Sequence, residues 1–154
     1  MKVRVEVQNG IEEDEVVIRC RTENAAVRAV CRFVMEQETP GADIVFLQGG
    51  REYYFPLGEV LFFETEGETV YAHTAGELFR VKYRLYELEE SLPPYFVRIS
   101  KSAIVNMRRI HAITRNITAS SRIEFRNSCK HVYVSRRYYA VLKERLQERM
   151  KYER

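Results

Sequence analysis

Apolar residues in the N-terminal part of the chain follow two different periods. Over residues 2–8, valines alternate with charged or polar residues, which predicts a half-buried strand, and residues 16–21 predict a second short strand. Residues 25–37 carry apolar side chains at helical spacing behind Asn24, which predicts an amphipathic helix with Asn24 as its N-cap. Together these elements make a small β-β-α unit. Because so small a unit is not stable alone, we expect it to pack against the rest of the chain or against a partner.

From Ile44 onward, short strand-length runs alternate with turn signals. The predicted strands are residues 44–48, 51–55, 60–64, 70–74, 78–82, 96–100, 111–116, 122–127 and 131–135. Two helices are predicted at 83–92 and 136–150. Many short strands without β-α alternation predict a mainly antiparallel β domain, in a chain that is α+β overall. We therefore divide the chain into an N-terminal unit, residues 1–42, and a β domain, residues 43–154.

The composition is that of a folded protein. The chain has 154 residues, of which 45% are hydrophobic and 31% charged, so it has enough apolar material for a core and is not intrinsically disordered. No run approaches the ~20 apolar residues of a membrane-spanning helix, and no apolar secretion signal is visible. The three cysteines are widely spaced and fit neither a disulfide framework nor a zinc-ligand pattern. We expect a reducing, cytoplasmic location.

Charge is divided unequally along the chain. Residues 1–97 carry 10 Lys and Arg against 18 Asp and Glu, whereas residues 98–154 carry 15 against 4, a net charge of +11. So large an asymmetry indicates a surface in the basic part that binds a polyanion such as nucleic acid. The alternative is a solvated basic face with no partner.

The first basic cluster lies at the end of the strand predicted at 96–100. Its basic and hydroxyl residues are Arg98, Ser100, Lys101, Ser102, Arg108 and Arg109. Arginine can pair with phosphate or with a guanine edge, lysine supplies a point charge, and serine bonds phosphate oxygens. The alternative is an ordinary basic turn that Asn106 closes with a side-chain-to-backbone hydrogen bond, and for Asn106 we favour this structural role.

The second basic cluster opens the last predicted helix. Ser135 is a suitable N-cap, and Arg136 and Arg137 follow it in the first turn. Arginines there oppose the helix dipole by about 0.3–1 kcal/mol each, so the sequence has another use for them. A helix N-terminus attracts anions, and arginine would complete a phosphate site. The alternative is that both side chains bridge to nearby carboxylates, which are few in this part of the sequence.

No motif of catalysis or metal binding stands out in the sequence. Cys129 and His131 would share a face of a strand, but one such pair is a weak metal signal. Neither a Gly-x-Ser-x-Gly motif nor a Gly-rich phosphate loop is present. With only Asp14 and Asp43 as aspartates, the chain also lacks the acidic cluster of a phosphoacceptor receiver domain. We expect no enzymatic activity, no cofactor, no metal site and no small-molecule substrate.

Three ordered motifs resemble the LytTR family of bacterial DNA-binding domains. They are the helical stretch 83–90, the strand and loop from Phe96 to Asn106, and the stretch from Val132 to Tyr138 with its trailing helix. Residues 60–64 are similar to the family's strand before its first DNA loop, and the resemblance covers residues 44–148. It implies an elongated fold of about ten short strands in three antiparallel sheets, with loops that enter successive major grooves.

The resemblance assigns residues for DNA recognition. It places the reading loop on Ser100 and Lys101 and the C-terminal reading arginine on Arg137, with a further loop from Thr65 to Thr69. The sequence departs from the family pattern at Ser100, where many members have histidine, and at Glu66 and Glu68, where polar or basic residues are common. Most characterised members carry an N-terminal receiver domain, whereas the N-terminal residues here are of another kind.

These observations predict a sequence-specific transcriptional regulator that binds double-stranded DNA. We expect Lys101 and Arg137 to read bases, and the remaining basic and hydroxyl residues to hold phosphates. These are Arg98, Ser102, Arg108, Arg109 and Arg136. The N-terminal unit is the expected site of homodimerisation or of docking to a membrane protein. The alternative, which the acidic first half favours, is a protein-interaction or sensor module that keeps the fold without reading DNA.

Overall fold

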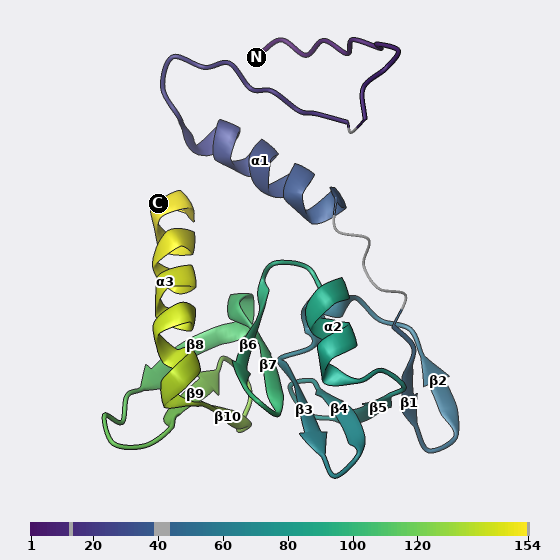
Figure 1. Ribbon diagram of the computed structural model, residues 1–154, viewed down its shortest axis with the longest axis vertical. Coiled ribbons are helices and arrows are strands. Elements are labelled where there is room, and N and C mark those ends of the chain that lie inside the picture. Colours follow the sequence, from purple (N-terminus) through teal and green to yellow (C-terminus); the bar gives the residue numbers. More distant parts are fainter. Residues whose placement is uncertain (13, 39–43, 154) are drawn as a thin grey trace.

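The computed structural model describes residues 1–12, 14–38 and 44–153, with side chains described up to residue 35 and from 44 to 150 (Figure 1). Its largest element is an antiparallel sheet of seven strands in the order β2-β1-β5-β4-β3-β7-β6. The strands are β1 (Phe46–Gln48), β2 (Arg51–Tyr53), β3 (Phe62–Glu66), β4 (Thr69–His73), β5 (Leu78–Val81), β6 (Phe96–Ser100) and β7 (Ala103–Asn106).

A second, three-stranded antiparallel sheet follows, with the order β10-β9-β8. It comprises β8 (Ile110–Thr114), β9 (Ser121–Phe125) and β10 (His131–Val134). The helices of the described chain are α1 (Ala25–Glu38), α2 (Leu85–Ser91) and α3 (Arg136–Glu153), with short 3-10 turns at Leu57–Glu59 and Met107–Arg109. None of the helices in the described ranges has the length and apolar character needed to cross a lipid bilayer.

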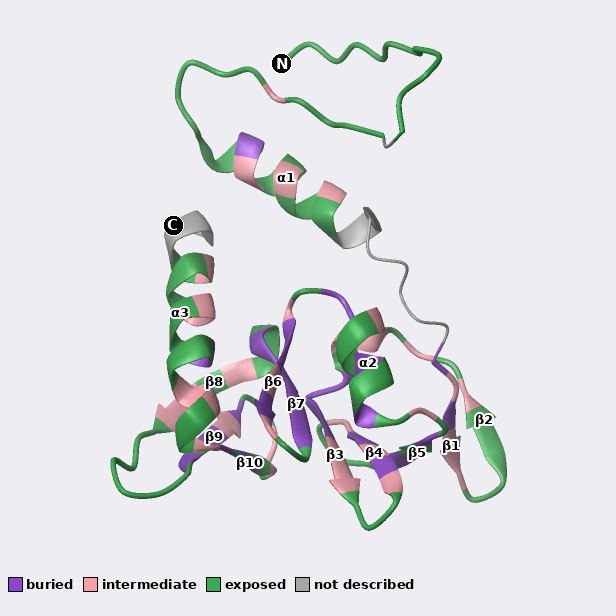
Figure 2. Cartoon of the chain, viewed as in Figure 1, coloured by how far each residue is buried: buried purple, intermediate pink, exposed green. Residues whose placement is uncertain are grey.

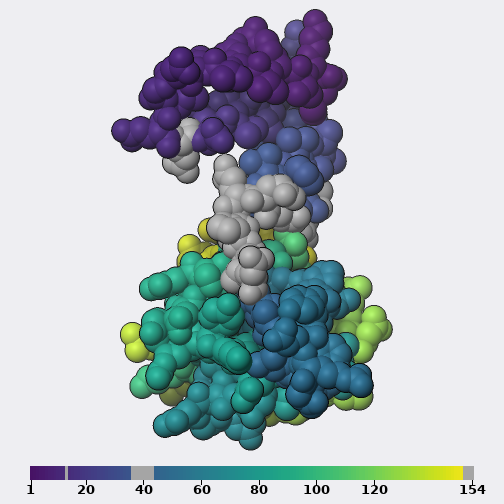
Figure 3. Space-filling view, turned by 90° about the vertical axis from the view of Figure 1, so that its right-hand side faces the viewer, coloured from purple at the N-terminus to yellow at the C-terminus, as the bar shows by residue number. Residues whose placement is uncertain are grey.

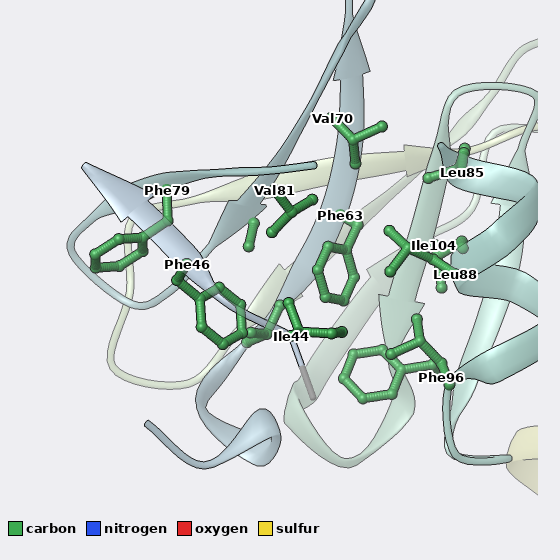
Figure 4. Close-up of a cluster of buried hydrophobic side chains, with 13 residues drawn as sticks. Ile44, Phe46, Phe63, Val70, Phe79, Val81, Leu85, Leu88, Phe96 and Ile104 are labelled. Atoms are coloured by element: carbon green, nitrogen blue, oxygen red, sulfur yellow. The ribbon is translucent and has the colours of Figure 1, made fainter. Parts of the chain in front are cut away.

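Two hydrophobic cores lie on the two faces of the central strands. One core joins the seven-stranded sheet to α2, and Figure 4 shows Phe63 and Ile104 pointing into it together with Leu88. The other core joins β6 and β7 to the small sheet and α3. Successive side chains of a strand point to opposite faces, so Phe62 and Val105 enter the second core. Both faces of the central strands are covered, as the buried residues of β7 show (Figure 2). Strands covered on both faces carry apolar residues at consecutive positions.

Helix α3 packs against β6 and the small sheet through its apolar side chains. Leu142 is fully buried in the second core, and Tyr138, Tyr139 and Leu146 pack around it. Beyond these residues the helix extends away from the sheets toward α1 (Figure 1). The later turns also remain tied to the β domain, because Arg145 donates to the carbonyl of Pro94 at 2.5 Å and Arg149 to that of Met107 at 2.6 Å.

The two strands predicted in the N-terminal unit do not form. Residues 1–12 and 14–24 contain no strand, and the valines of the first segment are exposed (Figure 2). A two-stranded ribbon is marginal in water unless another surface covers its apolar face, and no such surface covers these valines in the described chain. The predicted helix is confirmed as α1. The boundary predicted at residue 42 lies outside the described residues.

In the β domain, all nine predicted strands are confirmed, with ends that differ by no more than two residues. A tenth strand, β7, was not predicted because its residues are apolar without alternation. The resemblance implied three sheets, whereas the described strands form two. The reason is a single antiparallel pairing, Leu47 with Arg80, which joins the β1-β2 hairpin to the larger sheet.

Candidate nucleic-acid interface

The end of β6 and the start of α3 lie side by side. The backbone N–H of Ser135 donates to the carbonyl oxygen of Ile99 at 2.8 Å. Ile99 directly precedes Ser100 and Lys101, and Ser135 directly precedes Arg136 and Arg137. This hydrogen bond therefore brings together the two basic clusters, which are distant in the sequence, on one side of the β domain.

Hydrogen bonds from the Arg98 side chain hold the turn between β6 and β7. Arg98 donates from its Nε to the carbonyl of Ser100 and from a terminal nitrogen to the carbonyl of Lys101, both at 2.6 Å. Its other terminal nitrogen lies 2.6 Å from the Glu89 carboxylate. Within the turn, the Ser100 hydroxyl accepts a hydrogen bond from the Ser102 backbone N–H at 3.1 Å. Arg98 is thus a supporting residue, and its prediction as a direct phosphate contact does not agree with these bonds.

Lys101 lies exposed at the tip of this turn, and its ammonium group has no bonding partner among the described residues. Ser102 is also exposed, and its carbonyl accepts from the backbone N–H of Thr65 at 2.8 Å. The turn is therefore fixed on two sides, by Arg98 and by β3, while the Lys101 ammonium is available to a ligand.

The first turn of α3 presents two exposed arginines. The Arg137 guanidinium lies 5.9 Å from the centroid of the neighbouring Tyr138 ring. Ser135 occupies the N-cap position through its backbone, because its carbonyl accepts from Tyr138 and Tyr139 at 3.1 and 3.0 Å. The predicted cap through its hydroxyl is wrong, since Ser135 Oγ has no partner among the described residues. The first-turn amides of a helix lack intrahelical partners, and together with these arginines they can bind anions.

Arg108 and Arg109 lie apart from the β6-β7 turn. They lie at the far end of β7, a four-residue strand, and thus about 13 Å along the sheet from the turn. The Arg108 guanidinium stacks over the Tyr95 ring at 3.9 Å, and Arg109 Nε donates to the carbonyl of Gly58 at 2.8 Å. That these two arginines hold phosphates stays a prediction, and both guanidinium groups already have contacts within the protein.

An acidic turn lies beside the basic one. The stretch from Thr65 to Thr69 comprises the end of β3, the connecting turn and the start of β4, and the Thr65–Ser102 hydrogen bond ties it to the β6-β7 turn. Glu66 and Glu68 are exposed on it. Partial burial, followed by the charge of Glu66, raises the pKa of the Glu64 carboxyl on the adjacent strand. A polyanion that approaches Lys101 must therefore accommodate nearby negative charge.

Arg115 is a basic residue that the sequence motifs did not identify. It follows β8, in the connection to β9, and its guanidinium lies 4.9 Å from the ring centroid of Tyr139 in the first turn of α3. This connection runs along the same side of the domain as the start of α3 (Figure 1). Only the general excess of positive charge after residue 98 could have indicated it.

Two further polar residues, Asn106 and His73, have their contacts within the protein. Asn106 is completely buried; its Nδ2 donates to the carbonyls of Gly58 and Val60, and its Oδ1 accepts from Arg108 N–H, which confirms the predicted structural role. His73 stacks on Phe62, and burial with the nearby Lys130 charge lowers the pKa of His73 to about 4. No group of three or more His, Cys, Asp or Glu side chains in the described ranges could hold a metal ion.

Comparison with known proteins identifies the β domain. The family model of the LytTr DNA-binding domain matches residues 50–147. In the solved structure of the LytTr DNA-binding domain of a response regulator from Bacillus cereus, the fold is similar with a TM-score of 0.60 and 26% identity. That match covers 70% of this chain and 98% of the other.

Relatives in Staphylococcus aureus carry the name of uncharacterized HTH-type transcriptional regulators. Those of strains NCTC 8325 and COL are 39% identical over 90 residues, and that of strain MRSA252 is 38% identical. The aligned region spans 58% of this chain and 60% of the length of each relative. Since the family model matches more than half of the chain, the protein belongs to the LytTR family of DNA-binding domains.

Proposed function

We propose that this protein is a transcriptional regulator that recognises a specific double-stranded DNA sequence through the β6-β7 turn and the start of α3. The observation that carries the proposal is the Ser135–Ile99 hydrogen bond, because it holds Lys101 and Arg137 on neighbouring segments of one surface. Duplex DNA is long and uniformly charged, so a surface built from two basic segments can follow its backbone while individual side chains enter the major groove.

Within this surface the side chains have different roles. Lys101 and Arg137 contact base edges, because lysine and arginine both donate to the guanine acceptors of the major groove. Phosphate oxygens are bound by Ser100, Ser102 and Arg136. Arg115 adds a further phosphate contact beside the first turn of α3. Arg98 fixes the turn that carries Lys101, while Arg108 and Arg109 lie apart from that turn. In this scheme the partner is double-stranded DNA, and we expect the protein in the cytoplasm.

The experiment that tests the proposal is selection of binding sites from random duplex DNA with the full chain, followed by titration of the selected site. Lys101→Ala and Arg137→Ala should each weaken binding by about 1–3 kcal/mol and relax the preference at one position. Arg51→Ala is a matched control, because this side chain is exposed on β2, at the opposite edge of the larger sheet from β6. If no sequence is enriched at low salt, the proposal is wrong.

A second function is favoured by the acidic turn. Glu66 and Glu68 lie beside Ser102, so the surface is less attractive to phosphate than the basic clusters alone would be. A protein-interaction or sensor module with the same fold would bind no duplex DNA. If regulation in cells is unchanged by the double substitution of Lys101 and Arg137 to alanine, partner binding explains the function better.

The N-terminal residues supply the contact with a partner in this proposal. Their valines are exposed, as are Val30, Phe33 and Met35 of α1, and these side chains need a surface that covers them. We propose a second copy of the chain as that partner, so that the protein binds DNA as a homodimer. Docking to a membrane protein is the competing use of the same surface.

A further inference from the structure

The N-terminal segment exposes one apolar face to solvent. Val3, Val5 and Val7 are 86%, 82% and 92% exposed, and the residues that alternate with them are charged or polar. Figure 3 shows this part of the chain (purple) standing apart from the β domain. Such alternation is typical of a strand with one covered face, but among the described residues neither a neighbouring strand nor a covering surface meets it.

The rest of the N-terminal unit leaves an apolar groove open. A groove of about 730 Å³ runs between residues 14–20 and α1, and Val16, Ile18, Val27 and Val34 lie among its lining residues. On α1 itself, Val30 and Phe33 lie three residues apart on one face and are exposed. The unit therefore offers apolar surface that its own residues do not fill.

We propose that two copies of the chain associate through residues 3–7, paired as antiparallel strands about a two-fold axis at Val5. This proposal rests on the homodimer proposed above and specifies its interface. In this register Val5 lies opposite Val5 of the second copy, and Val3 lies opposite its Val7. Arg4 lies opposite its Glu6, so each charge meets one of opposite sign, which stabilises antiparallel pairs.

The charges select this register over its alternatives. Within one chain Arg4 already forms an ion pair with Glu6, so the two side chains can approach each other on this face. A shift of two residues would place Arg4 opposite Arg4, or Glu6 opposite Glu6. A parallel, in-register pair would align both sets of like charges, which destabilises a sheet.

The proposed pairing also explains the open apolar surface of the unit. A two-stranded ribbon is marginal unless its apolar face packs on something else. All valines of the paired segments would point to one side of the ribbon, because directly opposite residues share a face. The groove and the exposed face of α1, present once in each copy, supply the covering surface for an interface with two-fold symmetry.

Cysteine cross-linking of the full chain in the absence of DNA tests the register. In a background where Cys20, Cys31 and Cys129 are replaced by serine, Val5→Cys should form a covalent dimer under mild oxidation, because opposite Cα atoms lie about 4.5–5.5 Å apart. Val3→Cys alone should not, since its two copies are offset by about 13 Å. A mixture of Val3→Cys and Val7→Cys chains should cross-link. The proposal would be overturned if Val3→Cys, Val5→Cys and Val7→Cys, each tested alone, cross-linked equally or not at all.

Exchange of charges gives an independent test by analytical ultracentrifugation. Arg4→Glu and Glu6→Arg should each weaken self-association about tenfold, because each places like charges across both pairs. An equimolar mixture of the two variants, and the double variant, should associate like the original chain. An unaltered dimer in both single variants, or a monomer at all concentrations for the original chain, would contradict the interface. Neither measurement involves DNA, so a monomer that still binds its site through Lys101 and Arg137 would overturn this interface and the proposed homodimer but not the proposed DNA recognition.

Discussion

Arg98 and Glu89 connect α2 to the turn that carries Lys101. One terminal nitrogen of Arg98 lies 2.6 Å from the Glu89 carboxylate, while its other donors hold the carbonyls of Ser100 and Lys101. The Arg98 side chain is only 18% exposed, so its charge faces the protein more than the solvent. In the proposed DNA complex, Arg98 therefore acts through the shape of the turn.

The role of Arg98 predicts that lysine cannot replace it. Arg98→Lys keeps the charge but loses the planar fork that reaches three oxygens at once. We expect it to weaken specific DNA binding nearly as much as Arg98→Ala, by about 1–2 kcal/mol, with little change in the salt dependence. Arg136→Ala, in comparison, removes a proposed phosphate contact and should lower the salt slope by about one. Affinity titrations at several salt concentrations measure both quantities, and binding by Arg98→Lys equal to that of the original chain would contradict this role.

The acidic turn predicts a gain of DNA affinity on neutralisation. Glu66→Gln with Glu68→Gln removes two negative charges next to the Ser102 carbonyl contact while it keeps side-chain size. We expect tighter binding to all duplexes, by about 0.2–1 kcal/mol per charge, and a smaller ratio between specific and non-specific affinity. Glu90→Gln, an exposed position on α2, is the matched control. An unchanged affinity for random-sequence DNA would show that this turn lies outside the interface.

The sequence was sufficient to predict most of the β domain, because its strands are short, separated by turn residues and patterned on one face. The exception is β7. It lies between β3 and β6 with both faces covered, so it lacks the alternation that marks a half-buried strand. The N-terminal strands were predicted from a genuine alternation of valines, but pairing depends on a partner strand, and sequence periodicity cannot supply one.

The interface was only partly predictable for a similar reason. The motifs offer Lys101 and Arg137 as candidates, but residue type alone does not separate a side chain that meets solvent from one that holds backbone carbonyls, as Arg98 does. Arg108 and Arg109 follow the β6-β7 turn closely in sequence, yet β7 carries them to the opposite end of the sheet. Arg115 comes close to α3 only through the tertiary arrangement of the β8-β9 connection.

Asn106 is predicted to be essential for stability. Its Nδ2 satisfies the carbonyls of Gly58 and Val60 inside the protein. Asn106→Asp preserves shape and the acceptor for Arg108 N–H but places a carboxylate oxygen against two carbonyl oxygens. We expect a loss of about 2–4 kcal/mol in the free energy of unfolding, measured by urea denaturation. The same substitution at the exposed Asn116, which uses only its Oδ1, should be nearly neutral. Similar stability of the two variants would refute the structural role.

His73 predicts a loss of stability in mild acid. Burial, aided by the Lys130 charge, lowers the pKa of His73 to about 4 from an ordinary value of 6.5, and its Nδ1 is buried without a partner among the described residues. The unfolded chain therefore binds a proton more readily than the folded protein between these two values. The stabilising contribution is complete above pH 6.5 and is lost as the pH falls toward 4.

Because His73 is only partly buried, we expect the loss to be about 1–2 kcal/mol. His73→Phe keeps a ring that can stack on Phe62, as His73 does with ring centroids 4.2 Å apart, but it cannot take up a proton. Urea denaturation at a series of pH values should show a smaller fall in stability for His73→Phe than for the original chain across this range. His111→Gln, at an exposed position, should leave the fall unchanged. Parallel pH profiles for His73→Phe and the original chain would mean that acid destabilises the fold through other groups, with the carboxylates as the first alternative.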